Sequence, residues 1–288
     1  MYESFYNLRE SPFSLLPDPE FLYLGSKHSA ALAVLQYGLL SRAPITLVTG
    51  DIGCGKTTLV RRLLHELDEE TVVGLISNTH QSFGDLLQWV VLAFGIESRE
   101  MGKAELYQKF VAFLSEHYAQ NRRAVLIVDE AQNLEPKTLE ELRVLSNVNT
   151  DKHNLLQLIV VGQPELRDSL RRRELVQFAQ RIGVEYHLKP LPSEEVVHYI
   201  RHRVTVAGGN PTLFSREAIA LIDRYSGGIP RLINTLCNLS LVYGFARQEN
   251  TIEAPVVLEV VKDRTGDGTL PVPGSMGEAM SVGGRAPI

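Results

Sequence analysis

Ile45-Thr-Leu-Val-Thr-Gly-Asp-Ile-Gly-Cys-Gly-Lys-Thr-Thr58 is the segment of this chain that is most informative about its fold. Residues 45–49 are a short apolar, β-branched run of the kind that forms a strand buried on both faces. Residues 50–57 then fit the pattern G-x-x-x-x-G-K-[ST], and a one-sided apolar stripe follows from Lys56 to Leu67. A glycine-rich turn between a strand and a helix directs backbone N–H groups and the positive end of the helix dipole at an anion. The stretch therefore predicts a phosphate-binding loop.

This loop is expected to bind ATP together with Mg²⁺. The Lys56 ammonium would reach the β- and γ-phosphates, and the Thr57 hydroxyl would be a ligand of Mg²⁺. Cys54 is interpreted as a small side chain that the loop tolerates, and a readily oxidised thiol near a helix N-terminus is the alternative. The remaining loop residues that we expect to line the nucleotide are Gly50, Asp51, Ile52, Gly53, Gly55 and Thr58.

A second apolar run, Val125-Leu-Ile-Val-Asp-Glu130, ends in two adjacent carboxylates. At the end of a buried strand, Asp129 would hold Mg²⁺, and Glu130 would polarise the water that attacks the γ-phosphate. Alone, this pattern is more often an exposed strand end. The phosphate loop earlier in the chain favours the catalytic interpretation.

Gln163 follows another buried run, Leu155–Gly162. In an open parallel sheet, ligand-binding groups lie outside the carboxyl ends of the strands. If this strand lies between those that carry the loop and Asp129, the Gln163 amide would orient the attacking water. The alternative is a turn residue before Pro164.

Two positions among the arginines are candidates for contact with the nucleotide. Arg231 follows Pro230 in the first turn of a predicted helix, where a cation opposes the helix dipole, so a nearby anion such as the γ-phosphate is expected. One residue of the set Arg171–Arg173 and Arg181 is expected to be an arginine finger that acts on a neighbouring subunit, and Arg181, at the edge of the α/β region, is the first choice. A solvated arginine is the alternative for Arg231, and a nucleic-acid or partner surface is the alternative for Arg171–Arg173.

Strands and helices alternate up to residue 189, which predicts an α/β fold with a parallel sheet. Beyond it the apolar pattern is helical only. We therefore expect an ATPase domain over 1–189, a small all-helical domain over 190–264 and a disordered tail over 265–288. The predicted strands are 45–49, 72–77, 125–128, 155–162 and 184–187, and the predicted helices are 56–67, 82–94 (capped by Ser82), 103–118, 137–147, 196–207 (capped near Ser193), 215–225, 230–247 and 254–262.

Composition narrows the classes of function and the compartment. The net charge of −5 and pI near 5.9 argue against broad, non-specific DNA binding but not against a local basic patch. The two cysteines form neither a disulfide framework nor a metal motif, which indicates a reducing cytoplasm. The longest apolar runs fall far short of the ~20 residues that cross a bilayer, so membrane association is expected only through a partner.

In their order along the chain, these motifs resemble the AAA+ superfamily, and more narrowly the ATPases related to general secretion pathway protein A (the ExeA-like group). That group is similar to transposition ATPases of the TniB type and to origin-recognition AAA domains. The resemblance covers about residues 1–264. It is carried by Met1–Phe13, Pro17–Pro19, His28, Gly50–Thr58, Asp129–Gln132, Gly162–Leu166 and Gly227–Arg231.

The resemblance implies a five-stranded sheet of order 5-1-4-3-2 with helices on both faces and a helical lid. Gln163 and Arg231 would be the two sensor residues, Arg181 would lie near the finger position, and Tyr23 in the segment 21–24 would contact adenine. It also implies a homo-oligomer, a ring (a hexamer being one form) or a filament, assembled with ATP. The secretion relatives continue into a membrane span and a cell-wall-binding domain that this sequence lacks, which favours the shorter relatives of polysaccharide, exosortase or mobile-element loci.

Three functions stay open at this stage. The leading one is ATP hydrolysis that drives or regulates a partner assembly of cell-envelope export, in the cytoplasm or at the inner membrane through that partner. The second is an ATP-dependent, DNA-associated regulator of the transposition type. The third is a nucleotide-gated adaptor that binds ATP and barely hydrolyses it.

Overall fold

The computed structural model describes residues 1–77, 85–98, 101–149 and 154–266 of the 288-residue chain. Contacts between residues divide it into two compact units, each with a hydrophobic core of its own. The α/β unit comprises Ser29–Ile52 and Leu59–Leu188. The helical unit comprises Met1–His28, Gly53–Thr58 and the chain from Lys189 onward. None of the described helices is both long and apolar enough to span a bilayer.

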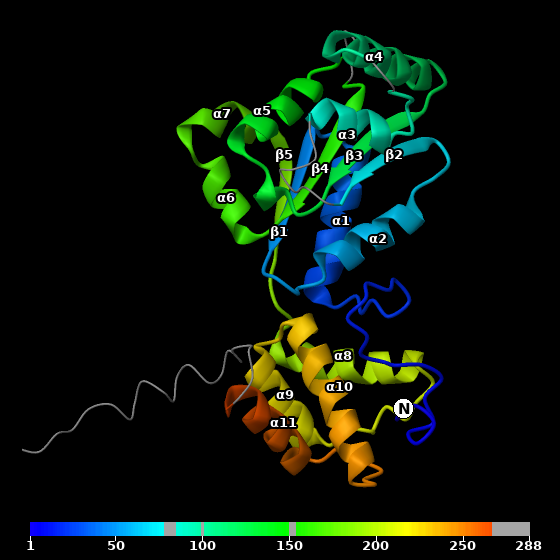
Figure 1. Cartoon of the computed structure of the whole chain (residues 1–288), viewed down its shortest axis with the longest axis vertical. Coiled ribbons are helices and arrows are strands. Elements are labelled where there is room, and N and C mark those ends of the chain that lie inside the picture. Colours follow the sequence, from blue (N-terminus) through cyan, green and yellow to red (C-terminus); the bar gives the residue numbers. More distant parts are fainter. Residues whose placement is uncertain (78–84, 99–100, 150–153, 267–288) are drawn as a thin grey trace, which may run out of the picture. The chain divides into compact units, whose positions relative to one another are not determined.

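The α/β unit is built on one parallel five-stranded sheet in the order β2-β3-β4-β1-β5 (Figure 1). This is the predicted order 5-1-4-3-2, read from the other edge, and every predicted strand is present. Runs of valine, isoleucine and leucine suit strands covered on both faces. The strands are β1 (Ile45–Gly50), β2 (Thr71–Ile76), β3 (Arg123–Val128), β4 (Leu156–Gly162) and β5 (Ile182–Leu188).

Helices cover both faces of this sheet, because alternate strand side chains point to opposite sides. Ile45 and Leu47 of β1 join a core with α3 (Leu86–Ala93), α4 (Lys103–Ala119), α5 (Pro136–Leu145) and α6 (Pro164–Leu170). Thr46 lies between Ile45 and Leu47 in β1 and faces the opposite side, toward α1 (Ser26–Leu40). A Cβ on Gly38 of α1 would lie only 2.1 Å from the Thr46 Oγ1. Neither α1 nor α6 was among the helices predicted from the sequence. The helix after the loop, α2, spans Lys56–Glu66.

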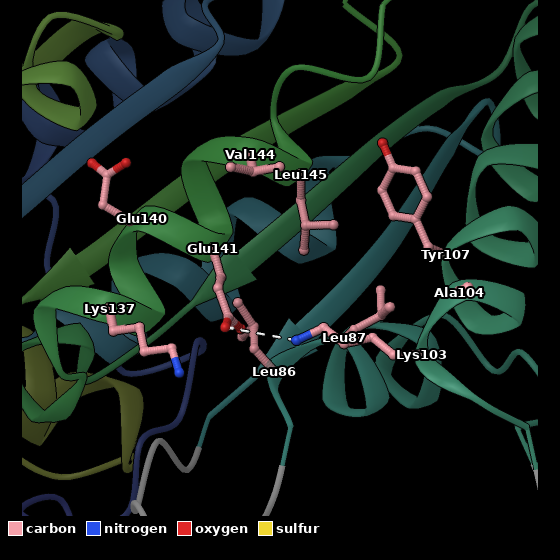
Figure 2. Close-up of a pocket in the computed structure, with 10 residues that line it drawn as sticks. All are labelled: Leu86, Leu87, Lys103, Ala104, Tyr107, Lys137, Glu140, Glu141, Val144 and Leu145. Atoms are coloured by element: carbon pink, nitrogen blue, oxygen red, sulfur yellow. Dashed lines mark ion pairs between the residues drawn. The ribbon is translucent and has the colours of Figure 1, made fainter.

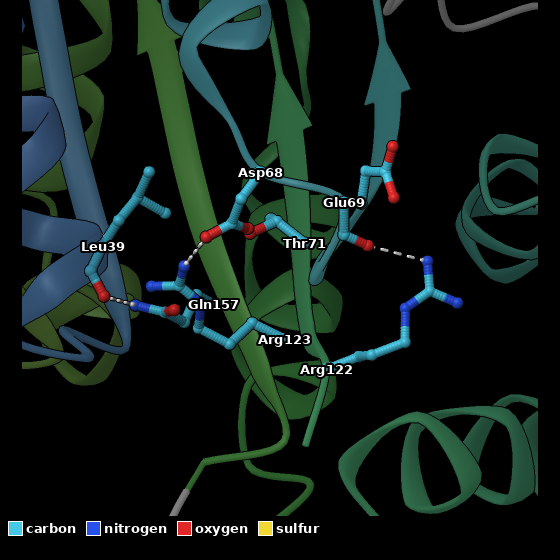
Figure 3. A network of polar contacts seen from close by, with 7 residues as sticks. All are labelled: Leu39, Asp68, Glu69, Thr71, Arg122, Arg123 and Gln157. Atoms are coloured by element: carbon cyan, nitrogen blue, oxygen red, sulfur yellow. Dashed lines mark hydrogen bonds and ion pairs between the residues drawn. The ribbon is translucent and has the colours of Figure 1, made fainter. Parts of the chain in front are cut away.

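Polar contacts tie together the amino end of the sheet (Figure 3). Buried Gln157 of β4 donates its amide to the carbonyls of Gly38, Leu39 and Ala43, at 3.2, 3.3 and 3.4 Å. The Gly38 and Leu39 carbonyls also accept the backbone N–H groups of Ala43 and Arg42, at 2.9 and 3.2 Å, so the amide adds to bonds that already close the end of α1. Arg123 at the start of β3 pairs with Asp68 before β2 at 3.1 Å. These contacts hold the end of the sheet opposite to the predicted phosphate site.

The helical unit contains α8 (Ser193–Val206), α9 (Arg216–Ser226), α10 (Pro230–Ala246) and α11 (Ala254–Gly266). The Ser215 hydroxyl caps α9 by accepting from the Ala218 N–H at 3.2 Å, and Gly227 ends that helix in the left-handed conformation. The predicted cap near Ser193 is one residue late, because Pro192 holds the cap position and Ser193 begins α8.

The first 21 residues are part of the helical unit and not of the α/β unit. Tyr2, Tyr6, Phe13 and Phe21 are all buried in its core. Arg203 of α8, itself buried, donates to the carbonyls of Pro12 and Ser14 and stacks over Phe21, 5.0 Å from the ring centre. The sequence analysis expected residues 1–189 as one domain, whereas the contacts group Met1–His28 with the chain from Lys189 onward. Local sequence patterns could not reveal this packing, since its partners are some 190 residues apart.

Two predictions reach residues outside the described part of the chain. The expected cap of α3, Ser82, lies outside it, and in the structure Asp85 caps this helix by accepting from the Leu87 N–H at 3.1 Å. The tail was expected from residue 265, whereas α11 continues to Gly266. Residues 267–288 lie outside the described residues.

Replacing Phe13 tests whether the N-terminal segment stabilises the helical unit. Phe13 is 1% exposed and packs edge-on against Phe214 at 5.7 Å. We expect Phe13→Ala to lower the free energy of unfolding by about 3–5 kcal/mol, because it leaves a cavity in that core. Urea unfolding measures this. Leu15→Ala, at a side chain that is 55% exposed, serves as the control and should change it by less than about 0.5 kcal/mol. If both variants changed the free energy of unfolding by the same small amount, Phe13 would not be packed in the core of the helical unit.

Candidate functional site

Three neighbouring strands of the α/β unit deliver predicted site residues to one edge of the sheet. In the parallel pairing, Thr49 of β1 lies opposite Gly162 of β4, and Val128 of β3 lies opposite Val160 of β4. The residues that follow these strands, Gly50 onward, Asp129 and Gln163, therefore leave the sheet at the same edge. This is the edge where ligands bind in open α/β sheets. The condition set for Gln163, that β4 lies between β1 and β3, is met.

The two carboxylates after β3 differ in exposure and in backbone conformation. Asp129 is 3% exposed, and its Oδ1 accepts the Glu130 N–H at 2.9 Å. Glu130 is partly exposed and adopts the left-handed conformation, with φ 54° and ψ 35°, just before the short helix η2 (Ala131–Asn133). A residue with a Cβ avoids this region at a cost of about 1–2 kcal/mol, and such strain concentrates at functional sites.

Two side-chain amides hold the Glu130 carboxylate. Its Oε2 accepts from Gln163 Nε2 at 3.2 Å and from Gln132 Nε2 at 2.5 Å. Gln132 Oε1 in turn accepts the backbone N–H of Gln163 at 2.9 Å. A Cβ on Gly162 would approach Gln132 Oε1 to 3.1 Å and Leu166 Cδ2 to 2.7 Å, so glycine leaves room for this arrangement. Gln163 was predicted from the sequence as a site residue, whereas Gln132 was not, although it belongs to the motif Asp129–Gln132.

The phosphate loop has the backbone that its glycines predict. Gly53 and Gly55 have φ of +83° and +92°, a region that side chains with a Cβ rarely adopt. Lys56, which begins α2, is 6% exposed. Cys54 is fully buried, so its thiol is packed rather than open to oxidants, as the structural interpretation expects.

Arg231 lies beside this loop, within the helical unit. It follows Pro230 in the first turn of α10, and its backbone N–H donates to the Gly53 carbonyl at 3.1 Å. A Cβ on Gly53 would lie 2.6 Å from the Cβ of Arg231, so the approach requires glycine. The Arg231 side chain itself is exposed.

His28, which the sequence analysis quoted only as part of a resemblance, also contacts the loop. The residue is 3% exposed, and its Nε2 lies 2.9 Å from the Cys54 carbonyl oxygen. Burial lowers the pKa of His28, against smaller opposing effects of the Cys54 carbonyl and Glu195. Its position in the sequence, at the start of an unpredicted helix, gave no signal for this contact.

Arg181 lies between the short helix α7 (Val176–Ala179) and β5, and it is half-buried. Burial, and then the nearby Arg143 guanidinium, lower its pKa. Within the described residues, no carboxylate lies within ion-pair distance of Arg181. By contrast, Arg171 and Arg172 form exposed ion pairs with close neighbours in the chain, Asp168 and Glu174.

Tyr23, the expected adenine contact, lies in the helical unit. Its ring packs edge-on against Tyr199 at 6.1 Å and lies 5.7 Å from the His202 ring. Tyr23 is half-buried in this aromatic group. A role toward adenine stays a prediction.

The residues present fit a nucleotide with Mg²⁺. A Cβ at Gly50 or Gly53 would collide with backbone or side-chain atoms at 2.5 or 2.6 Å, so the loop backbone is built without side chains at these points. Among the described residues no three His, Cys, Asp or Glu side chains gather as a metal site. Mg²⁺ beside a triphosphate takes only one or two protein ligands, because phosphate oxygens and water complete its shell. Thr57 and Asp129 are the two residues that the sequence analysis expects in this role.

A separate groove lies between α3, α4 and α5, with a volume of about 640 Å³ (Figure 2). Its floor is apolar, and an ion pair of 3.7 Å between Lys103 and Glu141 crosses it. None of the predicted site residues is among those that line it. The lining residues are Leu86, Leu87, Lys103, Ala104, Tyr107, Lys137, Glu140, Glu141, Val144 and Leu145.

Comparison with known families identifies the domain that carries the residues at this sheet edge. Residues 39–170, which hold the loop, Asp129, Glu130 and Gln163, match the family model described as "AAA domain". The chain contains an AAA domain. It is also 42% identical over 253 residues to general secretion pathway protein A of Aeromonas hydrophila. That match covers 88% of this chain and 46% of the relative, so the chain spans about half the length of that protein.

Solved structures show the same fold at low identity. The ORC2 protein of Aeropyrum pernix, in ADPNP and ADP complexes, superposes with a TM-score of 0.65 at 19% identity, covering 88% of this chain and 71% of that one. Cdc6p of Pyrobaculum aerophilum superposes with a TM-score of 0.67 at 18% identity, covering 84% and 67%. The predicted AAA+ and P-loop NTPase fold and the similarity to general secretion pathway protein A and origin-recognition proteins are thus confirmed.

The left-handed conformation of Glu130 can be tested through stability alone. Glu130→Gly and Glu130→Ala both remove the carboxylate and its two amide bonds, so they differ only in the backbone. We expect the glycine variant to be about 0.5–1 kcal/mol more stable in urea unfolding, since glycine adopts positive φ without strain. The same pair at Asn133, in η2, is the control and should show the opposite order, because helical backbone favours alanine. If glycine and alanine variants had the same order of stability at positions 130 and 133, the backbone strain at Glu130 would be contradicted.

Proposed function

We propose that this AAA domain binds Mg-ATP on the loop Gly50–Thr57 and hydrolyses it with Glu130 as the residue that activates water. One observation carries the proposal. The strand that leads into the loop and the strand that ends in Asp129 and Glu130 flank β4 at a single sheet edge, where two amides hold the Glu130 carboxylate. A strained, amide-held carboxylate at a ligand-binding edge is unusual for a residue with no chemical task.

The roles of the binding residues follow from their chemistry. Backbone N–H groups of the loop would donate to the phosphates, and Lys56 would supply a positive charge to the β- and γ-phosphates. Thr57 and Asp129 would hold Mg²⁺, which when bound neutralises charge that develops on the phosphate oxygens. Arg231, beside the loop, would add a cation near the γ-phosphate. Tyr23 would contact adenine.

Glu130 would take the catalytic role because it can accept a proton or a hydrogen bond from water. Gln132 and Gln163 both donate to its Oε2 and so fix the direction of the carboxylate that would receive the attacking water. Gln163 can also orient that water through its amide, since both residues follow adjacent strands. Positioning and electrostatic stabilisation account for most of the catalysis in phosphoryl transfer, so a fixed carboxylate suits this reaction.

The name of the Aeromonas relative supports a role in export across the cell envelope. We propose that ATP turnover drives or regulates a protein partner of such a system, from the cytoplasm or at the inner membrane through that partner. Assembly of several copies with ATP would place Arg181 toward a neighbouring copy. A half-buried guanidinium beside Arg143, with no carboxylate partner among the described residues, fits a group that receives an anion from outside its own unit.

Binding and turnover are separated by two variants. We expect Lys56→Ala to abolish binding of a fluorescent ATP analogue in the presence of Mg²⁺, since it removes the cation that faces the phosphates. We expect Glu130→Gln to retain binding but to lower phosphate release by about 100-fold or more, the usual effect of removing a catalytic base. Asn133→Ala is the control. Equal turnover of wild type and Glu130→Gln would indicate an adaptor instead of an enzyme.

A mixing experiment tests the trans role of Arg181. We expect Arg181→Ala to keep ATP binding and to lower turnover by about 10³-fold or more, as finger losses do. Adding subunits with Glu130→Gln, which carry Arg181 but cannot activate water, should restore turnover at mixed interfaces. Arg171→Ala, in an exposed ion pair, is the matched control and should leave turnover unchanged. Failure of mixing to restore activity in a proven oligomer would assign Arg181 to another role.

A further inference from the structure

We infer that His28 is a positioning residue of the phosphate loop, which holds the Cys54 carbonyl outward so that the Gly55 N–H faces the phosphates. This inference rests on the proposed binding of ATP by the loop. It concerns a residue outside the loop motif, in the first turn of α1. Four features of the helical unit, which includes residues 1–28 and 53–58, support it.

The first is the direction of the hydrogen bond. A carbonyl oxygen can only accept, so Nε2 of His28 must carry a proton and donate to Cys54 across 2.9 Å. The ring is buried, which lowers its pKa and keeps it neutral at pH 7. A neutral ring has one N–H, and its Nδ1 is buried without a hydrogen-bond partner among the described residues. The single N–H of the imidazole is therefore committed to the loop.

The second is the geometry of the peptide that joins Cys54 to Gly55. The structure has no cis peptide among its described bonds, so the C=O of Cys54 and the N–H of Gly55 point in opposite directions across one plane. When His28 holds the carbonyl, the Gly55 N–H points away from His28. Fixing the acceptor of a peptide group thus fixes the direction of its donor.

The third is a similar bond one residue earlier. The Arg231 backbone N–H, in the first turn of α10, donates to the Gly53 carbonyl at 3.1 Å. N–H groups in the first turn of a helix have no partner within the helix, so this donor is available. Two consecutive carbonyls of the loop are therefore held from outside by two distant segments. The Cys54 and Gly55 N–H groups are left on the other sides of their peptide planes.

The fourth is steric. A Cβ on Gly55 would come within 3.2 Å of His28 Nε2, and a Cβ on Gly53 would lie 2.6 Å from Arg231 Cβ. Glycine at 53 and 55 therefore permits both the positive φ of the loop backbone and the close approach of Arg231 and His28. A loop whose amides are already oriented loses less conformational freedom when a ligand binds, which increases affinity.

A matched pair of variants tests the role of the N–H group. His28→Gln places an amide N–H at about the position of Nε2, whereas His28→Met has similar length and no donor. We expect His28→Met to weaken binding of both Mg-ATP and Mg-ADP by about three- to tenfold, the range for one hydrogen bond between uncharged groups. His28→Gln should recover affinity to within about threefold of wild type. Displacement of a fluorescent nucleotide measures the dissociation constants.

The loss should be equal for ATP and ADP, because loop amides contact the α- and β-phosphates that both share. A loss for ATP alone, or equal affinities of the methionine and glutamine variants, would overturn the inference. Thermal melting without nucleotide shows whether each variant folds. If His28→Met unfolds, His28→Phe, which keeps a ring and has no donor, takes its place in the same comparison. If the wild type itself fails to bind Mg-ATP, the proposed function fails, which is a different outcome.

Discussion

Parallel pairing of β4 between β1 and β3 is the constraint on which the site depends. Backbone hydrogen bonds along both partners fix the register, so that Thr49, Gly162 and the end of β3 reach the same edge. In this order β4 is the only strand between the loop-bearing strand and the strand that leads to the carboxylates. Because side chains alternate along each strand, the same pairing also divides them between two buried faces, one of which holds the larger core. Core packing and site assembly are thus products of one topology.

At this edge of the sheet, Glu130 combines a strained backbone conformation with a carboxylate that is hydrogen-bonded. Glu130 takes up a left-handed backbone, while its carboxylate receives two amides and its N–H reaches the Asp129 carboxylate. The hydrogen bonds offset part of the cost of the backbone conformation, which local propensity alone would not select. Gly162 contributes no side chain, and a Cβ at this position would lie 3.1 Å from Gln132 Oε1 and 2.7 Å from Leu166 Cδ2.

The helical unit shows how distant segments can combine in one core. Residues 1–21 fill it with aromatic rings, and buried Arg203 binds their carbonyls. The loop glycines at 53 and 55 belong to the same unit and are contacted by His28 and Arg231. The amino-terminal segment, the loop and α10 thus depend on one another, although they are far apart in the sequence.

The fold class and the five strands could be predicted from the sequence and are confirmed, because continuous apolar runs bounded by turn residues are local properties. The phosphate loop, Asp129, Glu130 and Gln163 were likewise proposed from local patterns, the glycine spacing and the residues that follow strands. The sequence indicated the strand order only through resemblance. The packing of residues 1–21 with α8, the amide of Gln132 on Glu130 and the contact of His28 with Cys54 were decided by tertiary structure alone. Each joins residues through space, and a buried polar group finds its partner only when the fold has excluded water from both.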